Sequence, residues 1–295
     1  MNQNTDTSRI SFTAQVTGYI WFINGLSPDV FVTRLGKRLY NLIRPGMLTA
    51  RHVLGVADLE TYLMQRHLVI DHLLEQAVAE GVGQVLEPGC GLSPRGFRFK
   101  KKHPRIRYLE ADLPHMARWK KELLEQAGLM SDGHEILTCN ILDREGPDSL
   151  EQIAATHLDP DVPTALITEG VIGYFDRASL EPFWKAVGGL LSETGGCYLT
   201  DNVPILRGGL ASDLMRLWRR VIGLTTRGRM HAHFETTGDA ERVFQSLGFK
   251  EVIVHKPENL AGEIDIPVTR LPTSIQVIQA MGSGPGRKKH KPMNA

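Results

Sequence analysis

The pattern of hydrophobic and polar positions divides the chain into three zones. In the first zone, from about Ser8 to Gly81, the apolar spacing is helical and no strand pattern is convincing. Its last segment, 59–80, repeats leucine, isoleucine and valine at roughly helical intervals, and Gly81 can end that helix. The pattern therefore predicts a helical cap over residues 1–81.

The second zone alternates short apolar strands with amphipathic helices. Strands are expected at 84–87, 106–110, 135–139, 165–168 and 196–201, and helices between them include 116–127 and 179–191. Strands that alternate with helices form a parallel sheet with helices on both faces, because each crossover has to pass over a face. The expected class is α/β, with a core domain over residues 82–281.

The third zone begins near residue 205. An amphipathic pattern at 210–224 predicts a helical insert within this core, at about 205–235. A helix over 239–247 and strands over 249–255 and 274–280 are expected to follow. The tail, 282–295, combines glycines with a basic run and is expected to be disordered.

Composition narrows the class of protein. The net charge of +1 offers no overall electrostatic case for a nucleic-acid or membrane partner. The three cysteines lie far apart without a disulfide pattern, as in proteins of a reducing compartment. The first residues are polar, and no stretch reaches the roughly 18 apolar residues of a spanning helix. We therefore expect a cytoplasmic protein.

A glycine-rich loop follows the first expected strand. Gly89 and Gly91 allow a tight turn that lets backbone approach a ligand closely. The dinucleotide fingerprint requires a third glycine where this chain has Pro94, and proline offers neither the close helix packing nor an N–H group. A nicotinamide cofactor is therefore disfavoured. Glu87, just before the loop, could meet a cationic part of another ligand.

Polar residues also end the next three strands. Glu110 and Asp112 share one face of the second strand, where a carboxylate can accept hydrogen bonds from ribose hydroxyls. Asn140 could pair with an adenine edge or cap its own loop. Glu169 stands among apolar residues, and a buried carboxylate needs a cation or hydrogen-bond donors. An α-amino group or a sulfonium centre would satisfy it.

With these residues the chain resembles the leucine carboxyl methyltransferase family, including bacterial relatives that methylate polyketide-type carboxylates. The resemblance rests on the order and spacing of five segments: 11–14 with Thr17, 66–71 (RHLVID), 89–95 (GCGLSPR), 110–114 (EADLP) and 169–174 (EGVIGY). Three positions depart from the family pattern. Asn140 stands where an acidic residue is usual, Ser93-Pro94 where Asp-Thr is frequent, and His67 where threonine is common.

The resemblance implies a class I methyltransferase fold: a Rossmann-like, seven-stranded, mostly parallel sheet whose last strand is antiparallel, under a helical cap. It implies S-adenosylmethionine as the cofactor. Arg66 would bind the cofactor's carboxylate, a task that suits a bidentate guanidinium. The other implied roles are a methionine-lining loop for Gly89 and Gly91, a ribose contact for Asp112 helped by Glu110, an adenine contact for Asn140, an amino-group contact for Glu169, and orientation of the glycine loop by Arg95.

Whether methyl transfer needs a general base depends on the chemical class of the acceptor. A carboxylate is already ionised at neutral pH, whereas a phenol, with a pKa near 10, or an alcohol needs a general base. Tyr174 is the first candidate base, and His67 is another. We therefore predict O-methylation of a carboxylate on a small-molecule, polyketide-like acceptor or on a peptide. A phenol or alcohol methyltransferase, a non-catalytic binding protein and a nicotinamide-dependent oxidoreductase remain the alternatives.

Two further patterns invite functional interpretations. His231 and His233 alternate, but without a third ligand at useful spacing no metal site is expected. Arginines gather in the insert, where they form either a solvated helix face or a lid that attracts an anionic acceptor: Arg207, Arg219, Arg220, Arg227 and Arg229.

Overall fold

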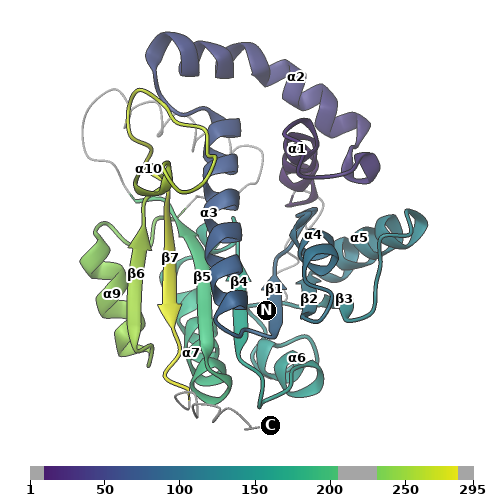
Figure 1. Cartoon of the computed structure of the whole chain (residues 1–295), viewed down its shortest axis with the longest axis vertical. Helices are drawn as coiled ribbons and strands as arrows, with labels where there is room; N and C mark the ends of the chain where they lie inside the picture. Colours follow the sequence, from purple (N-terminus) through teal and green to yellow (C-terminus); the bar gives the residue numbers. More distant parts are fainter. Residues whose placement is uncertain (1–9, 205–230, 285–295) are drawn as a thin grey trace, which may run out of the picture.

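The structure, a computed structural model, describes residues 10–204 and 231–284. Its centre is a seven-stranded sheet in the order β3-β2-β1-β4-β5-β7-β6 (Figure 1). The first five strands are parallel neighbours, and β7 pairs antiparallel with both β5 and β6. The strands are β1 (Gln84–Pro88), β2 (Arg107–Asp112), β3 (His134–Thr138), β4 (Thr164–Thr168), β5 (Gly196–Asn202), β6 (Glu251–His255) and β7 (Gln276–Met281). This arrangement confirms the predicted sheet.

Helices cover both faces of the sheet. One face carries α3 (Leu59–Ala79), α4 (Arg95–Lys102) and α5 (Pro114–Gln126), and the other carries α6 (Leu150–His157), α7 (Arg177–Thr194) and α9 (Thr237–Ser246). Strand residues alternate between two apolar clusters: Val85 faces α3, whereas Leu86 faces α6 and α7. Both faces are apolar because both are covered, as is usual for a parallel sheet.

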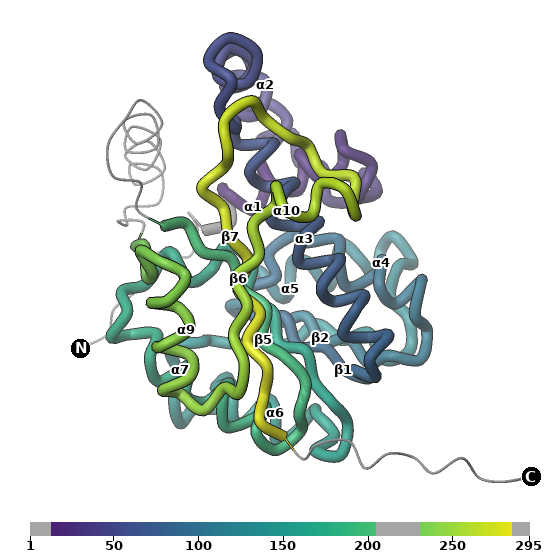
Figure 2. Tube along the Cα trace, turned by 60° about the vertical axis from the view of Figure 1, so that its left-hand side comes forward, coloured from purple at the N-terminus to yellow at the C-terminus, as the bar shows by residue number. Residues whose placement is uncertain are grey.

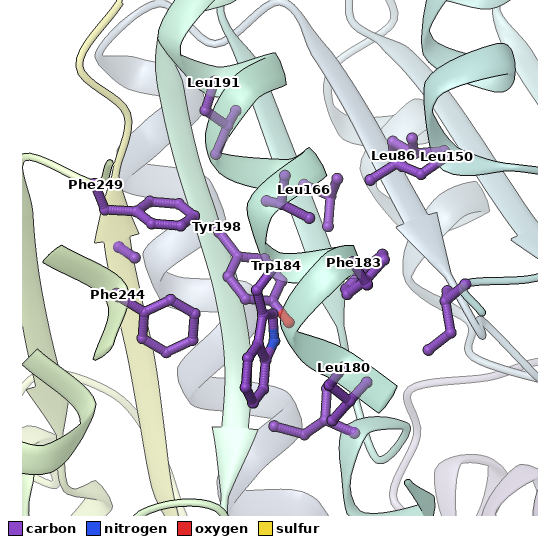
Figure 3. Close-up of a cluster of buried hydrophobic side chains, with 14 of the residues drawn as sticks. Leu86, Leu150, Leu166, Leu180, Phe183, Trp184, Leu191, Tyr198, Phe244 and Phe249 are labelled. Atoms are coloured by element: carbon purple, nitrogen blue, oxygen red, sulfur yellow. The ribbon is translucent and has the colours of Figure 1, made fainter. Parts of the chain in front are cut away.

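The larger cluster lies between α7, α9 and the sheet (Figure 3). Trp184 of α7 is fully buried there, and its ring centroid lies 5.5 Å from that of Phe244 in α9. Tyr198 of β5 packs edge-on against Phe244 at 5.8 Å. These aromatic contacts hold α7 and α9 against the sheet.

The N-terminal zone is helical, as predicted. It contains α1 (Ile10–Ile23), the 3-10 turn η1 (Asp29–Phe31), α2 (Arg34–Thr49) and a π-helical segment η2 (Ala50–Leu54) before α3. A third apolar cluster joins α1, α2 and the first turns of α3. The rest of α3 packs on the sheet, so one helix links the cap to the core (Figure 2). The proposed boundary at residue 81 stays a prediction.

Three smaller elements complete the described chain: η3 (Ile172–Tyr174), α10 (Pro257–Leu260) and the segment 261–275 that leads into β7. The expected helix at 210–224, the five arginines of the insert and most of the basic tail lie outside the described residues. Within the described ranges, no helix is long and apolar enough to cross a bilayer. No cluster of metal-binding side chains occurs in those ranges either, so the absence of a metal stays a prediction.

Gly36 sets the close approach of α1 and α2. A Cβ atom there would lie 2.2 Å from the Gln15 carbonyl oxygen of α1. Thr33 caps α2 by accepting the Gly36 N–H at 2.9 Å, and its hydroxyl donates to the Gln15 side chain. The glycine is therefore needed for contact between the two helices, not for backbone flexibility.

We predict that Gly36→Ala lowers the free energy of unfolding by about 1–3 kcal/mol, because the added methyl forces the helices apart. Gly46→Ala is the matched control on the same helix, since its added Cβ would meet no other element of the described chain within 4 Å. That change should stabilise by about 0.5–1 kcal/mol through helix propensity. Urea unfolding followed by circular dichroism measures both, and equal effects of the two substitutions would contradict the close contact.

Candidate functional site

Polar residues gather where the parallel strands end. β1 runs into the glycine loop, β2 ends at Asp112, Glu169 follows β4 and Asp201 lies near the end of β5. β1 and β4 are neighbours at the centre of the sheet, although they are distant in sequence. The crevice outside such a switch in strand order is the usual ligand site of an open α/β sheet.

The glycine loop is held in a shape that only glycine adopts easily. Gly89 and Gly91 have φ values of 72° and 50°. A Cβ at Gly89 would lie 2.3 Å from a methyl group of Val171, so a larger residue would clash as well as strain the backbone. Glycine at position 89 is therefore required both by the backbone conformation and by the packing of Val171 against the loop.

Asp112 is bonded to this loop. One carboxylate oxygen accepts the Gly91 N–H at 2.7 Å, and the other accepts the Leu113 N–H at 2.7 Å. The side chain is largely buried; burial raises the pKa of Asp112, although the two backbone hydrogen bonds oppose the shift. Each carboxylate oxygen keeps further acceptor capacity, which hydroxyl donors from a ligand could use.

Arg95, the first residue of α4, is the most heavily paired group near the crevice. It is fully buried and binds three carboxylates from different parts of the fold. Its Nε donates to Asp71 of α3 and its Nη1 to Glu87 of β1, each at 2.6 Å, while Nη2 donates to Glu169 at 2.5 Å. The Tyr108 hydroxyl also donates to Glu87 at 2.6 Å, so each Glu87 oxygen has an internal partner.

The pKa values show how this network holds its charges. Burial disfavours the ionised form of Glu169, but His67 and Arg95 outweigh it and hold the pKa of Glu169 well below its usual range. Burial likewise opposes ionisation of Asp71, but His67, Arg95 and Arg98 outweigh burial and lower the pKa of Asp71. Burial dominates at Glu87 and raises its pKa despite Arg95. Nearby cations therefore stabilise the ionised forms of Glu169 and Asp71, whereas burial is the dominant influence on the pKa of Glu87.

His67 is enclosed within the same network. Its ring is fully buried and stacks on the Trp21 indole of α1 at a centroid distance of 4.3 Å. Nδ1 lies 2.9 Å from Glu169 Oε2. The ring thus supports Glu169 from behind and presents no surface to the crevice.

Arg66 joins Glu169 to Asp201. Its Nε donates to Glu169 at 3.0 Å and its Nη1 to Asp201 at 3.3 Å. Asp201 also accepts the Gly170 N–H at 2.7 Å. A Cβ at Gly170, where φ is 68°, would lie 2.5 Å from Arg66 Nη2, so the guanidinium lies directly on the glycine backbone. Arg66, Glu169 and Asp201 form what we call the charged triad.

Asp201 was not among the residues singled out from the sequence. It is the acidic residue at the end of the fifth expected strand, so the same signal that indicated Asp112 and Glu169 was present there. Burial raises the pKa of Asp201, and Arg66 opposes that shift. The carboxylate is therefore one whose charge depends on a cation nearby.

Helix α1 lies over the glycine loop and contacts η3. The Thr13 hydroxyl lies 3.4 Å from the Tyr174 hydroxyl. A Cβ at Gly91 would be 3.6 Å from the Ala14 methyl, which is ordinary contact. Tyr174 is only partly buried, so it is the one proposed base whose ring lies at the boundary between cap and sheet edge.

Two predicted ligand contacts lie apart from this group. Glu110 is buried, with Lys120 Nζ at 2.6 Å and His134 Nε2 at 2.8 Å, and these partners overcome burial and lower its pKa. Asn140 is exposed, and its side-chain oxygen accepts the Leu142 N–H at 3.1 Å. Glu110 thus has internal partners, and Asn140 caps its own loop.

The structure therefore brings together Arg66, Gly89, Gly91, Asp112 and Glu169 from the sequence prediction, and adds Asp201. Glu87, Arg95 and His67 lie behind them as a buried support. His233, for which the sequence predicts no metal site, has its Nε2 atom 2.9 Å from the Ile172 carbonyl oxygen.

Proteins that are similar to this chain in sequence are named as methyltransferases. Leucine carboxyl methyltransferase 1 of Eremothecium gossypii is 26% identical over 174 residues, 53% of this chain and 52% of that protein. A putative S-adenosyl-L-methionine-dependent methyltransferase of Streptomyces coelicolor is 31% identical over 126 residues, 43% of each chain. The chain thus spans about half the length of the curated relatives it matches.

Solved structures share the fold at low identity. An O-methyltransferase family protein from Burkholderia thailandensis superposes with a TM-score of 0.51 at 16% identity, covering 75% of this chain and 57% of that one. The S-adenosylmethionine-dependent methyltransferase SibL gives a TM-score of 0.51 at 15% identity, covering 92% and 69%. These likenesses confirm the predicted class I methyltransferase fold.

The sequence profile of the leucine carboxyl methyltransferase family matches residues 31–187. The match includes Arg66, the glycine loop, Asp112 and Glu169, and it covers more than half of the 295 residues. This chain belongs to the leucine carboxyl methyltransferase family.

Proposed function

We propose that this protein transfers the methyl group of S-adenosylmethionine to a carboxylate oxygen of a small acceptor. The observation that carries the proposal is the row of groups along the carboxyl edge of the sheet, from Asp112 through the bare glycine loop to the charged triad. This row suits a ligand with hydroxyl groups at one part and paired opposite charges at another. The family membership supports the same reading.

The residues present fit the cofactor. Its methionine end carries an ammonium and a carboxylate, and the charged triad offers one guanidinium between two carboxylates. We assign the cofactor's carboxylate to Arg66 and its ammonium to Glu169 and Asp201. Asp112 would accept hydrogen bonds from the ribose hydroxyls, and Asn140, which is exposed after β3, would contact adenine.

The cofactor supplies the activated methyl group, so the protein's task is to bind, orient and exclude water. Orientation of two reactants can lower a barrier by about 7–11 kcal/mol. Arg66 and Asp112 would fix the two ends of the cofactor, and α1 would cover the glycine loop between them. Such a site needs no general base when the acceptor is already an anion.

The candidate bases favour a carboxylate acceptor. His67 is enclosed by Trp21, Glu169 and Arg95, so we assign it to support rather than proton transfer. Tyr174 is left as the candidate that can touch an acceptor, and its hydroxyl is adjacent to that of Thr13. We propose that Tyr174 donates a hydrogen bond that orients the acceptor carboxylate.

A calorimetric titration with S-adenosylmethionine and S-adenosylhomocysteine tests the cofactor assignment. We expect both ligands to bind, and we expect Asp112→Ala to weaken binding by about 1.5–3 kcal/mol, the range for a hydrogen bond to a charged group. Asp132→Ala, at an exposed aspartate before β3 and therefore at the opposite edge of the sheet, is the control and should bind normally.

Asp112→Ala also removes two loop hydrogen bonds, so Asp112→Asn is measured beside it. The amide keeps one acceptor oxygen and lacks the charge, and it should give an intermediate loss. Failure of the unaltered protein to bind either ligand would contradict the proposal and favour a non-catalytic role.

The pH profile of methyl transfer distinguishes the acceptor classes. With a panel of carboxylic acids and phenols, we expect transfer to acids, with kcat/KM level between about pH 6 and 9 because the acceptor is ionised throughout. Tyr174→Phe should lower kcat/KM by less than about tenfold without changing the shape of the profile, since loss of a true base costs about 10²–10⁴-fold.

Transfer to phenols alone, rising with pH and abolished in Tyr174→Phe, would overturn the carboxylate assignment. Radiolabelled methyl transfer, followed by base treatment that cleaves esters but not aryl ethers, identifies the product directly.

A further inference from the structure

Exposed apolar side chains are concentrated at one edge of the molecule. Seven of the eleven large hydrophobic residues exposed in the described chain lie on α2, η2 and the segment 268–271. Leu42 is 77% exposed and Val53 is 69% exposed. The seven are Leu35, Leu42, Leu48, Val53, Leu54, Val268 and Leu271. Clusters of this kind are unusual on a protein surface without a partner.

The same edge is strongly cationic. No aspartate or glutamate occurs between Asp29 and Asp58, a stretch that contains five lysines and arginines. They are Arg34, Lys37, Arg38, Arg44 and Arg51. The whole chain has a net charge of only +1, so this edge departs from the average. We call α2, η2 and residues 268–271 the cationic apolar edge.

The fold explains why these residues stay exposed. Helix α2 buries one stripe, Gly36, Tyr40 and Met47, against the rest of the cap. Leu35 and Leu42 are seven residues apart and therefore lie on one line beside that stripe. Arg34 and Arg38 lie on the outward side of the helix, and both are exposed. Apolar and cationic positions thus alternate around the outer surface of α2.

Segment 268–271 extends this surface beyond η2. The Leu271 N–H donates to the Gly55 carbonyl oxygen at 2.9 Å, and a Cβ at Gly55 would lie 3.0 Å from that of Arg270. Figures 1 and 2 show α2 and this segment at the same end of the molecule, the end away from α6. Residues 270–271 are therefore adjacent to the end of η2, at the same end of the molecule as α2.

We propose that the cationic apolar edge docks on the surface of an anionic lipid bilayer. Leucine and valine side chains would enter the boundary between headgroups and acyl chains, while arginines and lysines bind the lipid phosphates. Such a contact lies in the plane of the membrane and needs no spanning helix. The proposal does not depend on the methyl-transfer reaction.

Two other partners fit less well. In a symmetric dimer the same patch meets itself, so the six lysines and arginines of one edge would lie close to the six of the other. A nucleic acid would satisfy the cations, but it would leave Leu42 and Val53 against a highly charged surface. A membrane interface is the partner that takes both kinds of side chain together.

The test is flotation of the full chain with vesicles. We expect binding to phosphatidylcholine vesicles that contain about one third phosphatidylglycerol, little binding to pure phosphatidylcholine, and weaker binding as salt rises. Leu42→Ser with Val53→Ser, and separately Arg34→Glu with Arg38→Glu, should each lower vesicle affinity at least about tenfold.

The matched control is Leu142→Ser with Ile253→Ser, two residues that are each 40% exposed and lie elsewhere, beyond β3 and on β6. These changes should leave vesicle binding unaltered. Circular dichroism and the binding of S-adenosylhomocysteine report whether each variant is folded.

Three results would overturn the proposal. The first is absence of binding to anionic vesicles, or equal binding to neutral ones. The second is an equal loss of binding in the control variant. The third is a stable dimer or a nucleic-acid complex that the Leu42 and Val53 changes abolish, because either would identify another partner for this edge.

Discussion

The burial of one arginine is the constraint on which the site depends. Arg95 has no exposed side-chain surface, so its charge must be balanced inside the protein, and three carboxylates do so. These come from α3, from β1 and from the loop after β4, which are separate parts of the chain. Loss of one member of such a group leaves an uncompensated buried charge, which costs about 3–5 kcal/mol. The shared contacts to Arg95 therefore fix the positions of α3, β1 and the loop after β4 relative to one another.

This constraint has a consequence for the crevice. Glu169 is bound from behind by Arg95 and His67, so its other oxygen is directed to Arg66. Arg66 in turn meets Asp201, which is anchored on the Gly170 N–H. The charged triad is thus positioned before any ligand arrives. Preorganised charges of this kind lower the cost of ordering the site on binding.

The sequence predicted the sheet because its strands are apolar on both faces and end in polar residues. Asp112 and Glu169 could be singled out for the same reason. Glu87 and Glu110 have the same pattern, yet both bind internal partners, Arg95 for one and Lys120 for the other. Those partners lie on α4 and α5, and their reach depends on how the helices pack, which periodicity does not encode. Asp201 was overlooked, although it also ends a strand.

The net charge of the whole chain concealed the cationic apolar edge. A net charge of +1 suggested no charged partner, yet the charged side chains of α2 and η2 are all lysine or arginine. Acidic residues cancel these cations in the sum, and Glu60 and Asp265 line a pocket with Arg51, but exposed charges more than about 8–10 Å apart are screened from one another at physiological salt. The apolar members of this edge likewise look like core residues in the sequence. Only the packing of α2 on α1 reveals which of them face solvent.

The most direct test of the charged triad compares S-adenosylhomocysteine with 5′-methylthioadenosine, a neutral thioether like it that lacks the amino-acid end, in calorimetric titrations of the unaltered protein and Asp201→Asn. We predict tighter binding of S-adenosylhomocysteine by the unaltered protein. We also predict that Asp201→Asn loses much of this advantage, while its affinity for 5′-methylthioadenosine is unchanged. Equal affinity of the unaltered protein for the two ligands, or an equal loss for both in the variant, would contradict the assignment of the triad to the amino-acid end.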